Sequence, residues 1–257
     1  MSEARSIGAA AHPSNPPVEA AIRRASQATG IDFAYLLGEA RLESSLDPDA
    51  RAGTSSAAGL YQFTTGTWLS TLDRHGAEHG YGWAGDAIEG GRVRDPALRA
   101  EIMALRFDPG ASALMAAELA SDNRDMLRGV LGREPDASEL YLAHFLGADG
   151  AGKFLTALAA NPGQSAAALF PRAAAANRGI FFGADGSPRS LGAVMDLIRG
   201  KMESAMVNAH SPSGEGGSLP PPRPSMSDTL ASAFGGSPGA MPGHVRTAYG
   251  KLQAFGL

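Results

Sequence analysis

The sequence contains no cysteine, which excludes disulfide bonds and thiolate chemistry along all 257 residues. It also lacks any run of about 18 apolar residues, so no membrane-spanning helix is expected. An excess of positive charge is missing too, because the formal net charge is −4. This balance argues against nucleic acid or an anionic membrane surface as a partner.

An apolar secretory leader is not visible either. The opening residues, Met1-Ser2-Glu3-Ala4-Arg5-Ser6, are followed by no apolar stretch of the kind that a signal peptide requires. We therefore expect a processed or trimmed chain, an export route of another kind, or a cytosolic protein.

What the sequence does contain is one long region that is rich in helix signals, between two segments of different composition. Residues 1–16 are expected to form a flexible arm, and residues 17–208 an all-α globular domain. Residues 209–257 are rich in Pro, Gly and Ser, which predicts a disordered tail. The tail ends in a short apolar segment, residues 245–257, which is suited to docking on this domain or on a partner.

Helix-start signals recur along the predicted domain. Each is an Asn or Asp that is followed by Pro, by an apolar run or by a capping-box Glu. They occur at Asn15, Asp32, Asp95, Asp108 and Asp136. Ser187-Pro188 is expected to open the last helix of the domain, and residues 179–183 are the only short strand candidate.

Glu43 lies on the apolar face of an expected amphipathic helix. That face is marked by Phe33, Leu36, Leu37 and Ala40. A carboxylate on a buried face is costly unless it is paired or protonated, and burial raises its pKa toward the range that a general acid needs. The alternative is a helix-end Glu that pairs with Arg41 or Arg51.

Glu43 belongs to one short motif, and a second motif follows it in the chain. Glu43-Ser44 and Gly59-Leu60-Tyr61-Gln62 resemble the E-S and G-L-x-Q motifs of the soluble lytic transglycosylase family, also called SLT or goose-lysozyme-like. The third family motif, A-Y-N-x-G, is matched in place by residues 143–147, where His144 and Phe145 stand at the Tyr and Asn positions.

The resemblance covers about residues 17–205. Residues 141–147 and 108–115 resemble, more narrowly, a branch of the family that is associated with alphaproteobacteria. The family implies a lysozyme-like helical domain with a substrate groove. It also implies a peptidoglycan lyase that cleaves the MurNAc–GlcNAc β-1,4 bond.

In such an enzyme a single Glu, here Glu43, acts as acid and then as base. The C6 hydroxyl of the substrate closes a 1,6-anhydro ring, and no water is consumed. The residues implied to bind substrate are Gln62, Ser55, Ser56, Gly59, Tyr61, His144 and Tyr141. No cofactor or metal is expected, and the peptidoglycan substrate implies a periplasmic location.

Two other functions stay open. A second carboxylate would favour hydrolysis by a muramidase. Asp47 and Asp49 are the candidates, although they are more simply interpreted as turn residues around Pro48. A non-catalytic wall-binding module would keep the same domain and use its tail to join a flagellar or secretion apparatus.

The segment His75-Gly76-Ala77-Glu78-His79 matches the H-x-x-E-H pattern of a class of zinc peptidases. Gly76, Gly80 and Gly82 make a poor helix, and no third ligand helix is obvious in the residues that follow. The segment is therefore interpreted as a polar loop that rims the sugar cleft.

Overall fold

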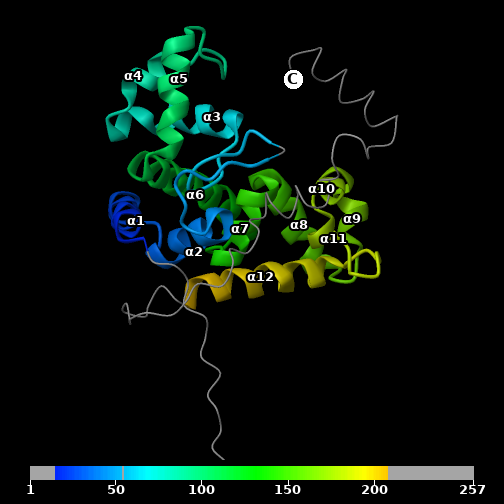
Figure 1. Ribbon diagram of the computed structural model, residues 1–257. Helices are drawn as coiled ribbons and strands as arrows, with labels where there is room; N and C mark the ends of the chain where they lie inside the picture. Colours follow the sequence, from blue (N-terminus) through cyan, green and yellow to red (C-terminus); the bar gives the residue numbers. More distant parts are fainter. Residues whose placement is uncertain (1–14, 54, 208–257) are drawn as a thin grey trace, which may run out of the picture.

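The computed structural model describes residues 15–53 and 55–207 (Figure 1). Helices make up most of these residues, and the described part of the chain has isolated β-bridges but no strand. This confirms the all-α prediction. Most of the predicted arm at 1–16 and all of the predicted tail at 209–257 lie outside the described residues.

The helices follow one another along the chain in a simple order. They are α1 (Pro16–Thr29), α2 (Phe33–Ser44), α3 (Thr65–His75), η1 (Gly76–His79), α4 (Gly82–Asp86), α5 (Pro96–Ala104), η2 (Leu105–Phe107), α6 (Pro109–Leu131), α7 (Ala137–Leu146), α8 (Ala148–Ala160), α9 (Ala166–Leu169), α10 (Pro171–Ala176), α11 (Arg178–Phe181) and α12 (Leu191–Val207). Within the described ranges, none of them has the length and apolar character needed to cross a bilayer, in agreement with the prediction of no membrane span.

The long helix α6 organises the packing. It contacts α1, α2, α3, α7 and α8, and small side chains cover much of its buried surface. Helix α12 packs against α2, α7 and α8, and Figure 1 shows it running past these helices. Helix α2 is thus enclosed by α1, its neighbour in the chain, and by α6 and α12, which come from distant parts of the sequence.

Helix α2 is buried nearly all round, and the prediction of an amphipathic helix is therefore wrong. Its buried residues are Ala34, Tyr35, Leu36, Leu37, Gly38, Glu39, Ala40, Glu43 and Ser44. Gly38 allows α12 to approach closely, since a Cβ there would lie 3.0 Å from Met206 and 3.2 Å from Met202. Two carboxylates of α2, those of Glu39 and Glu43, are consequently placed in the interior.

The predicted helix starts are confirmed. The side chains of Asp32, Asp95 and Asp108 accept hydrogen bonds from backbone N–H groups of the first turns that follow them. Asp136 and Glu139 form the predicted capping box of α7. Asn15 precedes α1 without a side-chain cap, and its amide donates instead to the carbonyl of Leu46 at 3.3 Å.

Helix α2 ends at Ser44, before Pro48 is reached. Ser45 and Leu46 take positive φ values of 55° and 66°, which reverses the chain direction at once. The N–H of Ser45 closes the helix on the carbonyl of Arg41 at 3.1 Å. Local left-handed geometry therefore ends the helix and fixes Glu43 in its last turn.

Ser187-Pro188 does not open the last helix, so this prediction is wrong. The carboxylate of Asp185 accepts hydrogen bonds from the N–H and the hydroxyl of Ser187, which forms a turn. Pro188 then pairs with Phe182 in an isolated bridge, and α12 begins at Leu191. The expected strand at 179–183 is also wrong, because most of it belongs to α11.

Candidate active site

Glu43 and two side chains of α7 form the centre of the site. Glu43 has 6% of its surface exposed. The hydroxyl of Tyr141 donates to Oε1 of Glu43 at 2.9 Å, and Nε2 of His144 lies 3.6 Å from the same oxygen. The structure thus brings together three of the residues implied by the motifs, although they are far apart in the sequence.

A second carboxylate, Glu39, belongs to this cluster and was not predicted. It lies one turn before Glu43 on α2 and has 2% of its surface exposed. Its Oε1 is 2.7 Å from Nδ1 of His144, while its Oε2 is buried without a hydrogen-bond partner. The available sequence signal was the spacing of four residues between Glu39 and Glu43, which places both on one helix face.

His144 therefore lies between two buried carboxylates, one at each ring nitrogen. Burial alone would lower the pKa of His144, but the charges of Glu39 and Glu43 outweigh this effect and raise the pKa to about 9. The imidazole is consequently protonated at neutral pH, and both of its nitrogens are donors.

The pKa of Glu43 is raised because burial disfavours its charged form. The nearby positive charge of His144 and the hydrogen bond from Tyr141 act in the opposite direction, without cancelling the effect of burial. Glu43 is thus a carboxyl group that keeps its proton more readily than an exposed Glu. Its carboxylate, once formed, has donors already in place.

Lys201 of α12 adds a second cation near Glu43. Burial lowers the pKa of Lys201, and the charge of Glu43 raises it. Tyr141 stays neutral, because burial and the adjacent Glu43 raise the pKa of its hydroxyl well above the ordinary value. The site combines two carboxyl groups, two cationic side chains and one neutral donor.

The loop between α2 and α3 carries the remaining predicted residues. Gln62 takes a positive φ of 49°, and its Nε2 donates to the carbonyls of Ala50 at 3.3 Å and Gly59 at 2.9 Å. Gly59 has a φ of 79°, and a Cβ there would lie 2.0 Å from the carbonyl oxygen of Arg106. Gly59, implied by the resemblance to bind substrate, therefore permits a close approach of its backbone to that of Arg106.

The two predicted serines are exposed and bonded within the loop region. The hydroxyl of Ser55 accepts from the N–H of Ala57 at 3.2 Å, and that of Ser56 accepts from the N–H of Thr65 at 3.2 Å. These bonds shape the loop and the start of α3. Neither serine is placed in the cluster that contains Glu43 and His144.

Tyr61 lies in the core, which corrects its predicted role as a substrate-binding residue. It has 0% of its surface exposed, and its hydroxyl donates to the carbonyl of Leu36 at 3.1 Å. Ser44, beside Glu43 in the first motif, donates to the carbonyl of Leu60 at 2.7 Å. The two motifs therefore hold the loop against α2.

The two candidate carboxylates for hydrolysis lie on the surface turn that follows α2. Asp47 and Asp49 are exposed, and Oδ1 of Asp47 accepts from the N–H of Asp49 at 2.9 Å. This geometry is that of turn residues around Pro48, as the sequence was interpreted.

A pocket of about 460 Å³ adjoins the end of α7. Phe145 and Leu146 line one side of it, and residues of α9 and α10 line the other. Its volume is in the range of small-molecule sites. Neither Glu43 nor His144 is among the lining residues, so this pocket is not the cleft of the acid itself.

No protein-family model matches the sequence. A function for this chain is therefore inferred from the chemistry of the site itself. What the site offers chemically is one buried acid of raised pKa, with a cationic imidazole and a phenol at the same oxygen.

Proposed function

We propose that this chain is a peptidoglycan lytic transglycosylase, which cleaves the MurNAc–GlcNAc β-1,4 bond without water. The observation that carries the proposal is Glu43, a buried carboxyl group of raised pKa that is held by donors from α7. Its position in the motif Glu43-Ser44 and the loop at Gly59–Gln62 add the resemblance to the transglycosylase family.

The proposed reaction proceeds in two steps on one carboxyl group. Glu43 first gives its proton to the leaving glycosidic oxygen as the bond to C1 of MurNAc breaks. The carboxylate then accepts the proton of the C6 hydroxyl, whose oxygen bonds to C1. The products are a free GlcNAc hydroxyl and a 1,6-anhydroMurNAc end, and Glu43 is protonated again.

His144 and Tyr141 support the intermediate state of this cycle. Between the two steps Glu43 carries a negative charge in a buried place, which is costly without partners. The imidazolium of His144 and the hydroxyl of Tyr141 lie at its Oε1 and stabilise that charge. Because these donors are in place beforehand, the proton can leave and return with little rearrangement.

The arrangement favours one acid over two. A hydrolytic enzyme needs a second carboxylate facing the substrate across the scissile bond. Glu39 is buried and paired with His144, and Asp47 is a turn residue on the surface. Neither is positioned as the base that activates water.

The remaining parts of the proposal follow from its substrate. A lysozyme-like groove would bring the glycan strand to Glu43, with the pocket beside Phe145 and Leu146 as one extension of that groove. Peptidoglycan as the partner implies action in the periplasm. A contact with a flagellar or secretion apparatus would involve the tail at 209–257, outside the described residues.

The decisive experiment is mass spectrometry of the products released from purified peptidoglycan. The parent chain should release muropeptides one water lighter than hydrolytic products, and Glu43→Gln should release none. Asp47→Asn, which removes a nearby exposed carboxylate, should behave as the parent. Ordinary reducing ends would instead assign a muramidase, and an active Glu43→Gln would overturn the role of Glu43.

A further inference from the structure

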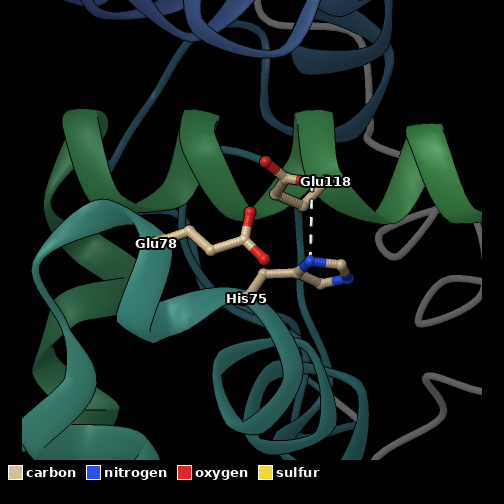
Figure 2. A group of neighbouring side chains, drawn as sticks. All are labelled: His75, Glu78 and Glu118. Carbon is tan, nitrogen blue, oxygen red and sulfur yellow. Dashed lines mark ion pairs between the residues drawn. The ribbon is translucent and has the colours of Figure 1, made fainter.

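A second cluster of His and Glu side chains lies between α3–η1 and α6, away from the proposed site. It consists of His75 at the end of α3, Glu78 in η1 and Glu118 in α6. The potential ligand atoms of these three residues all lie within 4.8 Å of one another. Figure 2 shows the three side chains converging on one space from α3, η1 and α6.

The ring of His75 is oriented by carboxylates at both of its nitrogens. Nδ1 lies 3.6 Å from Oε2 of Glu118, inside the cluster, and Nε2 lies 3.0 Å from Oδ2 of Asp122. Imidazoles that bind metals commonly give their second N–H to a carboxylate, which fixes the tautomer and the ring. Asp122 occupies this position behind His75.

His79 adds a second imidazole at the edge of the cluster. Its Nε2 is 2.7 Å from Oε1 of Glu118, so the two oxygens of Glu118 face two different histidines. The side chains of His75, His79 and Glu118 are only 13–17% exposed, whereas Glu78 is exposed. The cluster is therefore largely enclosed but open to solvent on the side of Glu78.

The helix supplying a further ligand, which was not obvious from the sequence, is α6. Glu118 lies 39 residues after His79 in the chain and meets it through the packing of α6 against α3.

The glycines near the cluster shape the turn that follows α3. A Cβ on Gly76 would lie 3.2 Å from the carbonyl of Tyr81, and Gly80 has a φ of 83°, so both shape the turn that carries Glu78.

We propose that His75, Glu78 and Glu118 bind a divalent transition-metal ion of the zinc class, with Asp122 orienting His75. One imidazole nitrogen and two carboxylate oxygens form a donor set that suits Zn²⁺ better than Ca²⁺ or Mg²⁺, which prefer oxygen alone. The fourth position falls to water or to His79. The ion ties the turn after α3 to α6 and serves a structural purpose, in contrast to the expectation of no metal.

The same residues form an ion-pair network when no metal is bound. Glu118 pairs with both histidines, and Asp122 pairs with Arg74 at 2.7 Å as well as with His75. A metal must therefore displace protons or paired charges from the imidazoles and Glu118.

The test is equilibrium dialysis of the full chain against Zn²⁺, with bound zinc counted per chain. One ion per chain is expected, and Glu78→Gln and Glu118→Gln should each weaken binding by at least about tenfold. Asp122→Asn should weaken it by roughly 10–100-fold, although it removes no ligand. Bound zinc should also raise the Tm of the parent chain in proportion to the logarithm of its concentration.

The control is Glu134→Gln, which removes an exposed carboxylate that pairs with Arg128 outside the cluster. It should bind zinc as the parent does. If Glu78→Gln and His75→Asn both bind zinc with the affinity of the parent, the ion lies elsewhere and the proposal is wrong. Glu78 is exposed, so its replacement tests the site even where Glu118→Gln fails to fold.

Discussion

Two clusters of His and Glu side chains join pairs of helices in this molecule, and they differ in their access to water. In the α2–α7 cluster, formed by Glu39, Glu43 and His144, the side chains are 3%, 8% and 17% exposed. The α3–α6 cluster consists of His75, Glu78 and Glu118, and Asp122 lies behind it at Nε2 of His75. There Glu78 is exposed and the side chain of Asp122 is 31% exposed.

Because the two clusters differ in burial, similar carboxylate and imidazole groups are suited to different functions in them. In the α2–α7 cluster, burial raises the pKa of Glu43, and the two carboxylates raise that of His144. Proton positions there depend on a few fixed neighbours, which suits acid–base chemistry. In the α3–α6 cluster solvent reaches the edge, so charges can exchange partners and an ion can enter.

The largest predicted difference concerns stability when one charge is removed in or beside each cluster. Glu39→Gln removes one of the two carboxylates beside a buried imidazolium, and we expect a loss of about 3 kcal/mol in the free energy of unfolding. Asp122→Asn removes a partly exposed charge and should cost less than about 1 kcal/mol. Urea denaturation of both variants at pH 7 measures the two losses.

Equal losses in the two variants would contradict the comparison, because they would mean that burial does not separate the clusters. Circular dichroism of the native states serves as the control, since it shows whether either replacement changes the helical fold itself.

The second prediction concerns the effect of pH on stability through the α2–α7 cluster. Because the pKa of His144 is raised to about 9 in the folded state, its contribution to stability is full below its unfolded value of about 6.5. It is lost as the pH rises through about 9. The raised pKa of Glu43 acts in the same direction, since the folded state holds that proton more tightly.

The full shift of His144 corresponds to a loss of about 3 kcal/mol in the free energy of unfolding between pH 6.5 and pH 9.5. Urea denaturation across this range measures the slope, and Glu39→Gln should flatten it. A stability that rises with pH over the same window would show that His144 is not held as a cation.

The elements that could be predicted from the sequence are those set by local chemistry. Asp108 and Asp136 cap helices through side-chain bonds to residues within the next turn, so a short segment contains the whole signal. Ser187-Pro188 looked similar locally. Asp185 holds it in a turn and Pro188 pairs with Phe182, which competes with a helix start.

The candidate site, too, could be predicted only where the signal was local in the sequence. Glu43 could be identified by its motif, but the burial of all of α2 depends on α12, more than 140 residues further along the chain. Glu39 could not be preferred to Asp47 or Asp49 as a second carboxylate, because only the packing of α7 shows that Glu39 faces His144. Likewise, Glu118 joins His75 only through the packing of α6 on α3.

The smallest predicted effect concerns salt, and it separates the clusters by screening. Arg74 pairs with Asp122 at 2.7 Å, with side chains 49% and 31% exposed. Arg74→Ala should therefore lower the free energy of unfolding by less than about 1 kcal/mol in dilute buffer. The loss should vanish at about 1 M NaCl, where the screening length is roughly 3 Å. Buried charges are screened far less, so the loss caused by Glu39→Gln should persist at the same salt concentration. Urea denaturation of both variants at low and high salt measures how much of each loss in the free energy of unfolding remains. If high salt erased both losses, His144 would lie within reach of solvent ions, and the two clusters would not differ in screening.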